Sequence, residues 1–220
     1  MAPLKLLIVD DHPLFRDALG GMLAAAFDGA RLVEADGLDA MIGQLAHEPS
    51  VDLVLLDLDL PGACGLAGLI QLRASYPEVP VVILSATTDA QLAEDVMAFG
   101  ASGFIPKSTA ADQIRGALNA VLAGETWLPA SLHDGDQSDE PDNQSVSPAK
   151  QIAPLVAQLS AQQTRVWLLM ARGLSDDDIA STLVISDATA KAHVSNVLQK
   201  LGASNRTQAA SILSRWVVSP

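Results

Sequence analysis

The sequence predicts two domains of different fold class. Residues 1–128 indicate an α/β domain with a flavodoxin-like, doubly wound five-stranded parallel sheet, and residues 155–220 indicate an all-α domain of four helices. Three observations support this prediction: short apolar runs alternate with helical patterns in the N-terminal part, a polar acidic segment follows, and only helical patterns come after it. Continuous Val/Ile/Leu runs are typical of strands that are buried on both faces of a parallel sheet.

The N-terminal domain should contain five strands, each followed by a helix. The strands are expected at residues 4–9, 30–35, 52–57, 80–85 and 102–105. The helices are expected at residues 13–26, 38–47, 65–75, 89–99 and 109–123. Parallel strands need crossover connections, which are usually helices, so this alternation indicates repeated βαβ units.

A polar segment at residues 129–154 separates the two domains. It has five acidic residues and one lysine, a formal charge of −4, and no periodic apolar pattern, so we expect a flexible linker. Residues 1–128 carry 6 basic and 17 acidic residues, a charge of −11. Residues 155–220 carry 6 basic and 4 acidic residues, a charge of +2. This asymmetry suggests that the two domains do different jobs.

The composition restricts the class of protein. The hydrophobic content of 49% favours a globular protein over a disordered one. Apolar runs are too short to span a bilayer, and we see no signal-peptide pattern, so we expect a cytoplasmic protein without a membrane partner. The single cysteine, Cys64, excludes an internal disulfide.

Polar residues follow four of the expected strands. Asp10 and Asp11 end the first strand, Asp57 ends the third, Ser85 ends the fourth, and Lys107 follows the fifth. The carboxyl ends of parallel strands form the usual binding edge of an open sheet. Carboxylates at close range need a cation such as Mg²⁺, and an aspartate can itself accept a phosphoryl group. A single acidic residue after a strand is more often a solvated turn, but this set predicts a Mg²⁺-assisted phosphoryl acceptor.

The same residues carry a resemblance to a known family. The stretches IVDDHPLFRDAL, LLDLDLPGACG, LSA and GFIPKS resemble the receiver domain of two-component response regulators across nearly all of residues 4–124. The resemblance implies phosphorylation of Asp57, with Lys107 beside it. It implies that Asp10, Asp11 and Asp57, with the main-chain carbonyl of Asp59, bind Mg²⁺. Two further residues would form the switch, namely Ser85 as the hydroxyl and Phe104 as the coupled aromatic.

An alternative interpretation makes the chain an enzyme. DLDLPG contains the DxD motif of haloacid-dehalogenase-type phosphatases, in which Asp57 would be the nucleophile and Asp59 the general acid. Against it, that motif normally ends the first strand, and Pro61 stands where threonine or valine is expected. It also leaves the pair Asp10 and Asp11 unexplained, so we expect a protein that is not an enzyme.

The C-terminal domain contains four helical patterns with recognisable ends. Serine or asparagine stands at each expected N-cap, and glycine at two expected C-terminal caps: Ser160, Ser175, Ser186, Asn205, Gly173 and Gly202. The third helix follows a short helix and a tight turn and carries lysine and amide side chains, which suits the major groove of DNA. A helical bundle for protein docking would fit the residue pattern as well.

A second resemblance separates these alternatives. Residues 158–212 are similar to the LuxR-type helix-turn-helix, which with a receiver is the arrangement of the NarL/FixJ class of response regulators. The resemblance makes residues 186–201 the recognition helix. It implies that Lys191, Ala192 and Ser195 face base edges, and that three further residues reach phosphates: Thr189, Asn196 and Lys200. Lys191 is the expected reader of guanine, the base edge that lysine and arginine most often contact.

Together the two resemblances imply a DNA-binding transcriptional response regulator. The expected partners are a sensor histidine kinase, double-stranded DNA and RNA polymerase, with a homodimer on DNA formed through residues 205–216. A receiver-led scaffold that never binds DNA is the alternative outside these classes. We also expect the unphosphorylated receiver to inhibit DNA binding, either through its negative charge or by covering the recognition helix.

Overall fold

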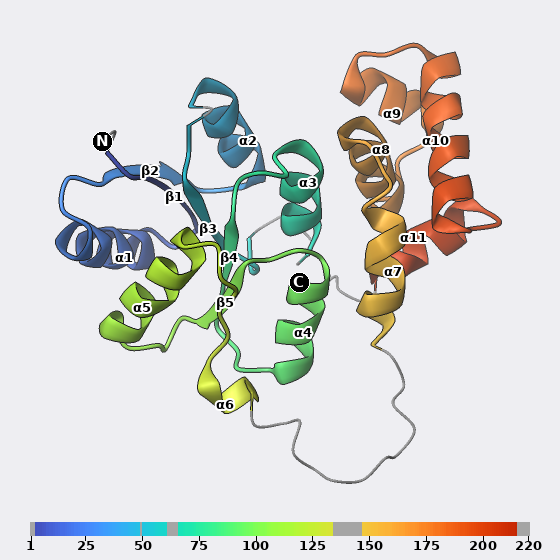
Figure 1. The fold of residues 1–220 in the computed structure, drawn as a ribbon. Helices are drawn as coiled ribbons and strands as arrows, with labels where there is room; N and C mark the ends of the chain where they lie inside the picture. The colour runs from blue at the N-terminus through green and yellow to red at the C-terminus, as the bar shows by residue number, and fades with distance from the viewer. Residues whose placement is uncertain (1–2, 49, 61–65, 134–146, 215–220) are drawn as a thin grey trace, which may run out of the picture.

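The computed structural model describes residues 3–48, 50–60, 66–133 and 147–214. Its N-terminal domain contains a parallel sheet in the order β2-β1-β3-β4-β5 (Figure 1). The strands are β1 (Lys5–Val9), β2 (Arg31–Ala35), β3 (Leu53–Asp57), β4 (Val81–Ser85) and β5 (Gly103–Pro106). The predicted fold class is therefore confirmed, and every strand begins one residue after its expected start.

Five helices cover the two faces of this sheet. They are α1 (Pro13–Ala26), α2 (Leu38–His47), α3 (Ala67–Ser75), α4 (Ala90–Ala98) and α5 (Ala111–Leu122). Successive strand residues point to opposite faces. In β1, Leu6 and Ile8 therefore pack with α1 and α5, and Leu7 and Val9 pack with the other three helices. Because both faces are buried, the strands need the uninterrupted apolar runs that the sequence shows.

The C-terminal domain consists of α8 (Ala161–Ala171), α9 (Asp176–Leu183), α10 (Asp187–Leu201) and α11 (Arg206–Ser214). The side chains of Ser160, Ser175 and Ser186 cap the first three of these helices. Asn205 accepts a hydrogen bond from the backbone N–H of Gln208 at 2.9 Å. The fully buried Trp167 donates its Nε1–H to the carbonyl of Ala209 at 2.8 Å, which joins α8 to α11.

The segment that was expected to be a flexible linker is partly helical. Within residues 129–154 lie α6 (Ala130–His133) and most of α7 (Pro148–Val156), whereas residues 134–146 lie outside the described residues. Ser147 caps α7, and Pro148 occupies a position in its first turn that needs no hydrogen-bond donor. Buried Ala149 and Val156 belong to the apolar core. The linker prediction is therefore wrong for α7, because packing on the receiver stabilises this helix.

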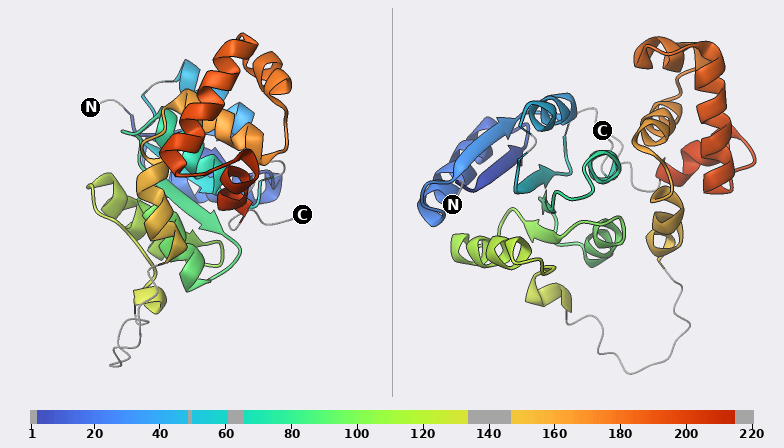
Figure 2. Two further views of the ribbon diagram at one scale, coloured as in Figure 1. Left: turned by 90° about the vertical axis from the view of Figure 1, so that its right-hand side faces the viewer. Right: turned by 45° about the horizontal axis from the view of Figure 1, so that its top comes forward.

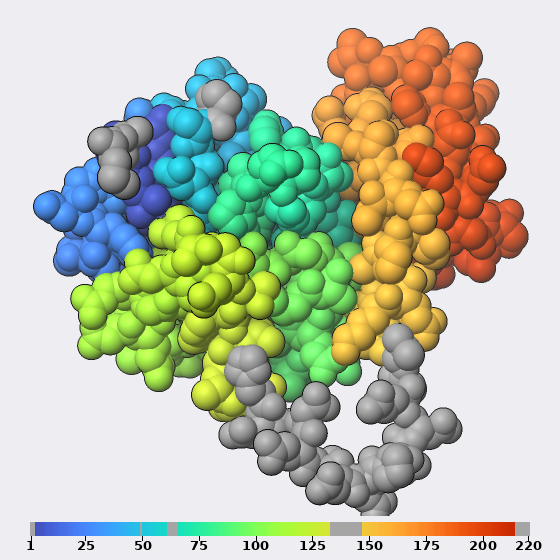
Figure 3. All heavy atoms as spheres, in the orientation of Figure 1, coloured from blue at the N-terminus to red at the C-terminus, as the bar shows by residue number. Residues whose placement is uncertain are grey.

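Helices α7 and α8 pack against α4 and α3 of the N-terminal domain (Figures 1 and 3). Ser147 Oγ donates a hydrogen bond to Asp95 Oδ1 at 2.8 Å. Gln91 Nε2 donates to the same carboxylate oxygen at 3.0 Å and to Ser147 Oγ at 3.2 Å. At the exposed edge, Lys150 Nζ lies 3.1 Å from Glu94 Oε2. We call the contact of Gln91, Asp95 and Ser147 the α4–α7 contact.

The helix α10 lies on the side of the C-terminal domain that faces away from the sheet (Figures 1 and 2). The apolar core nevertheless continues from the receiver helices through α7 and α8 to Val197 and Leu201 of α10. Among the described residues, no helix is long and apolar enough to cross a bilayer.

Candidate functional site

The predicted polar residues meet at one edge of the sheet. Asp10 directly follows β1, Asp57 ends β3, Ser85 ends β4, and Lys107 directly follows β5. Parallel strands place these four positions side by side, as the order β1-β3-β4-β5 requires. The Asp10 side chain is completely buried, and Asp57 and Ser85 are each 2% exposed. Burial of two carboxylates this close requires a compensating charge.

Lys107 supplies that charge. Its Nζ donates to Asp10 Oδ2 at 2.7 Å and to Asp57 Oδ2 at 2.8 Å. Its backbone N–H donates to the carbonyl of Ser85 at 2.7 Å, which holds the lysine at the end of β4. Burial lowers the pKa of Lys107, but hydrogen bonds and charge from Asp10 and Asp57 outweigh it, so the pKa is raised and the ammonium stays charged.

The carboxylate of Asp57 is held on both oxygens. Oδ2 accepts from Lys107, and Oδ1 accepts from the backbone N–H of Asp59 at 3.2 Å. Burial raises the pKa of Asp57, and the hydrogen bonds from Lys107 and Asp59 offset this only in part. Protonation is therefore easier than in water, and a further cation beside Asp57 would favour the ionised form that a nucleophile needs.

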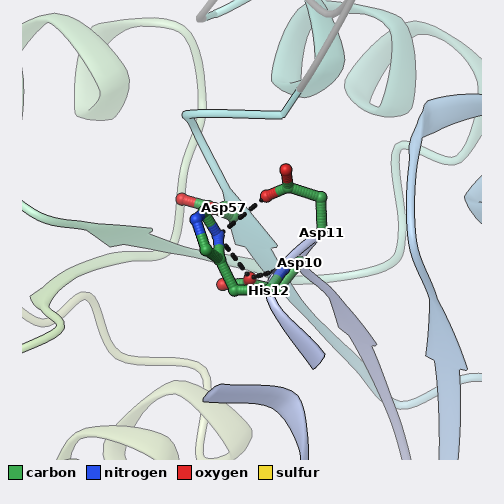
Figure 4. A group of neighbouring side chains, drawn as sticks. All are labelled: Asp10, Asp11, His12 and Asp57. Carbon is green, nitrogen blue, oxygen red and sulfur yellow. Dashed lines mark hydrogen bonds and ion pairs between the residues drawn. The ribbon is translucent and has the colours of Figure 1, made fainter. Parts of the chain in front are cut away.

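Asp11 and His12 complete the group on the outer side (Figure 4). Ligand atoms of Asp10, Asp11, His12 and Asp57 all lie within 4.8 Å of one another. Asp11 Oδ1 is buried and accepts no hydrogen bond from the described residues, although His12 Nδ1 lies 2.9 Å away. A buried carboxylate oxygen in this position, next to two other carboxylates, fits a hard cation such as Mg²⁺. Mg²⁺ prefers oxygen to imidazole nitrogen, so the exposed His12 is not expected to be a ligand.

Ser85 and Phe104 lie where the sequence predicted them. The Ser85 hydroxyl accepts a hydrogen bond from the backbone N–H of Thr87 at 3.3 Å. Phe104, in β5, is completely buried. The structure thus places Ser85 at the carboxyl end of β4 and buries Phe104 in β5, and their switching roles stay predictions.

Two residues of α1 were not predicted. The Phe15 ring lies under Lys107, with Nζ 4.6 Å from the ring centroid, and Arg16 Nη1 donates to the carbonyl of Asp10 at 2.5 Å. From α1, Phe15 thus contacts the ammonium of Lys107, and Arg16 binds the main chain of Asp10. The available signal was their spacing, because they come one helical turn after Asp11 and His12.

The second predicted site is on α10. Lys191, Ala192 and Ser195 are exposed, as are Thr189 and Asn196, so these five side chains form one solvent-facing strip. Two of the hydroxyls already have partners: Thr189 Oγ1 lies 2.8 Å from Ser186 Oγ, and Ser195 Oγ donates to the carbonyl of Lys191 at 3.0 Å. Of the two expected forms of inhibition, covering of the recognition helix is wrong for this structure, because α10 faces away from the receiver.

Lys200 differs from the other five residues. Its Nζ donates to the carbonyl of Gln158 at 2.8 Å and to Gln163 Oε1 at 2.7 Å. This lysine therefore ties α10 to the preceding helices. It would have to give up both hydrogen bonds to reach a DNA phosphate.

Comparison with known proteins identifies a family for each of the two domains. Residues 6–119 match the model of the response regulator receiver domain, and residues 157–213 match that of the luxR family of bacterial regulatory proteins. The chain belongs to the response regulators that join these two domains, the NarL/FixJ class, and it is a DNA-binding transcriptional regulator by family.

Three relatives illustrate the similarity. The chain is 40% identical over 206 residues to the glycerol metabolism activator of Pseudomonas putida, covering 93% of this chain and 92% of that protein. A LuxR family DNA-binding response regulator from Silicibacter pomeroyi is 34% identical, with a TM-score of 0.52 over 58% of this chain and 98% of the other. RcsB from Salmonella typhimurium shares the fold, with 21% identity, a TM-score of 0.55, and coverage of 98% and 100%.

The geometry predicts how Mg²⁺ binding responds to two neighbouring substitutions. Asp11→Ala removes the buried carboxylate oxygen that lacks a hydrogen bond, and should weaken Mg²⁺ binding by about tenfold or more, because ligand charge sets the affinity. Asp59→Ala is the matched control, since the expected ligand there is the main-chain carbonyl. Titration calorimetry with MgCl₂ measures both. Equal affinity in wild type and Asp11→Ala would contradict the assignment.

Proposed function

We propose that phosphorylation of Asp57 by a sensor histidine kinase switches this protein, and that the switched form binds paired DNA half-sites through α10. The observation that carries the proposal is the bridge from Lys107 to the buried Asp57 and Asp10, next to the buried Oδ1 of Asp11, which has only the exposed His12 imidazole beside it. A cation that is held against the acceptor aspartate can stabilise the charge of a phosphoryl group during its transfer.

The transfer requires only groups that are placed around Asp57. A carboxylate oxygen of Asp57 attacks phosphorus, the bond from phosphorus to the kinase histidine nitrogen breaks, and the electron pair stays on that imidazole. Lys107 holds its ammonium beside the phosphoryl oxygens, and the N–H of Asp59 orients the acceptor carboxylate. Mg²⁺, when it is bound by Asp10, Asp11, Asp57 and the Asp59 carbonyl, neutralises further negative charge.

Phosphorylation would change the conformation of the residues at the ends of β4 and in β5, and this change would reach α4. Ser85 ends β4, and the segment after it leads into α4, which begins at Ala90 and carries the α4–α7 contact. A phosphoryl group on Asp57 offers acceptor oxygens to the O–H of Ser85, and Phe104 repacks in response. Movement at the start of α4 would then weaken the hold on α7.

We propose that docking of the C-terminal domain opposes dimer formation rather than covering α10. Ala210 and Leu213 of α11 line a cavity of about 310 Å³ together with Leu38, Ala67 and other residues. These two residues fall within the range 205–216 that we expect to form the dimer. A receiver that is docked against α11 would hinder the approach of a second copy of the chain to the same helix. A monomer binds paired half-sites weakly, so docking would lower the affinity for DNA. The DNA-bound dimer would then act on RNA polymerase.

Phosphorylation is the first test. With Mg²⁺ and acetyl phosphate, the full-length protein should gain one phosphoryl group that is stable in acid and labile in base, as expected of an aspartyl phosphate. Intact-mass spectrometry measures the gain. Asp57→Ala should abolish it, whereas Asp59→Ala should retain it, because only the backbone of Asp59 bonds to the acceptor. Normal labelling of Asp57→Ala would refute the assignment, and release of phosphate from a generic phosphomonoester would favour the phosphatase alternative.

DNA binding through α10 gives a second prediction. Lys191→Ala should lower the affinity for a preferred site by about 1–3 kcal/mol and relax specificity at one base pair. Lys200→Ala is a matched control, and we expect it to change affinity less, because its ammonium is already bonded within the domain. Fluorescence anisotropy with DNA selected by the wild type measures both. A larger loss for Lys200→Ala, with a flatter salt dependence, would show that this lysine leaves its partners to bind phosphate.

The α4–α7 contact gives a third prediction. Ser147→Ala removes a buried hydrogen bond to a carboxylate, an interaction that typically contributes about 1.5–3 kcal/mol. It should raise the affinity of the unphosphorylated protein for paired half-sites by about tenfold. Ser160→Ala is the control, because it removes the cap of α8 without touching α4. If both variants bind DNA like the wild type before phosphorylation, docking does not inhibit the protein.

A further inference from the structure

The turn between α9 and α10 contains an unusual backbone conformation. Val184 has φ 54° and ψ 49°, and it is the only non-glycine residue with positive φ in the described part of the chain. Its N–H bonds to the carbonyl of Ser181 at 3.3 Å, and the next N–H, of Ile185, bonds to that of Ala180 at 3.0 Å. Such a helix end usually uses glycine or asparagine, because a β-branched side chain is strained in the left-handed region.

The valine side chain has no structural use that would explain this strain. It is 90% exposed, and only one other large apolar side chain among the described residues, Leu14, is comparably exposed. Neither burial in the core nor the geometry of the turn therefore favours valine at this position. Strain and exposure are independent observations, and both coincide on one residue.

Val184 lies close in sequence to the solvent-facing strip of α10, the surface proposed to bind DNA. It lies two residues before Ser186, the N-cap of α10, and the first residues of a recognition helix are those that contact base edges. The neighbouring hydroxyls are engaged within the chain: Ser181 Oγ donates to the carbonyl of Asp177 at 2.9 Å, and Thr182 Oγ1 donates to that of Asp178 at 2.7 Å. The group that this turn offers to a ligand is therefore the apolar isopropyl group of Val184.

We propose that Val184 is a specificity-determining residue that contacts the 5-methyl group of a thymine in the DNA half-site. The inference rests on the proposed DNA binding through α10. The thymine methyl is the apolar group that the major groove presents, and burial against an isopropyl group removes apolar surface of both from water. The stiff, β-branched side chain on a fixed turn loses little conformational entropy when it makes this contact.

Uracil substitution tests the contact directly. DNA selected from a random pool by the phosphorylated full-length protein is prepared with each thymine replaced singly by uracil, which removes the methyl and keeps base pairing. The wild type should lose about fourfold in affinity at one thymine of each half-site, which corresponds to burial of one methyl group. Val184→Gly and Val184→Asn should show no loss at that position. Both residues tolerate positive φ, so both variants should melt at or above the temperature of the wild type.

A matched control separates Val184 from the rest of the strip. Ala192→Gly removes the other small apolar side chain that is expected to face base edges, and it should leave the uracil effect at the Val184 position unchanged. An undiminished uracil effect in Val184→Gly and Val184→Asn would overturn the proposal, as would the absence of any uracil effect in the wild type. Failure of the wild type to bind any DNA would instead overturn the proposed function, so the two failures are distinguishable.

Discussion

The hydrogen bonds from Lys107 to Asp10 and Asp57 allow a group of like charges to exist at the end of a buried sheet. If the lysine were removed, both carboxylates would stay buried without compensation, which typically destabilises a fold by about 3–5 kcal/mol. The same residue also extends the pairing of β5 with β4, because the backbone N–H of Lys107 donates to the carbonyl of Ser85. One ammonium does not balance three carboxylates, however. This surplus of negative charge attracts a cation to the edge, and carboxylate oxygens are the ligands that Mg²⁺ prefers, which is why we propose that ion for this site.

The two candidate sites, the acidic edge (Asp10, Asp11, Asp57 and Lys107) and the solvent-facing strip on α10, lie in different domains. The acidic edge is at the carboxyl ends of the strands, and the strip on α10 faces away from the sheet. No residue of the acidic edge needs to touch α10 for the two to be coupled, since α7 and α8 contact both the receiver helices and α10. Coupling through packed helices that have two arrangements is the physical form that such a connection usually takes.

The sequence predicted those features that follow from local pattern. Strand positions were predictable because burial on both faces demands continuous apolar runs, and the acidic edge followed because parallel strands end on one side. Helix α7 was not predictable, since Pro148 and Pro154 lie in a polar stretch and the helix gains its stability from α4. Similarly, the polarity of α10 was clear from the sequence, but the direction of the long Lys200 side chain depends on Gln158 and Gln163, which precede it by 42 and 37 residues.

Because α7 begins at Pro148, few residues separate it in sequence from the receiver. Only the 13 residues between His133 and Ser147 connect the last described receiver residue to the helix that docks on α4. A chain of this length spans at most about 50 Å. A short covalent connection gives each domain an effective concentration at the other that is in the millimolar range. Contacts too weak to join two separate molecules can therefore hold the domains together within one, and here the α4–α7 contact acts together with the packing of α8 on α3. A change of about 1.4 kcal/mol in the free energy of docking shifts the ratio of docked to undocked molecules tenfold.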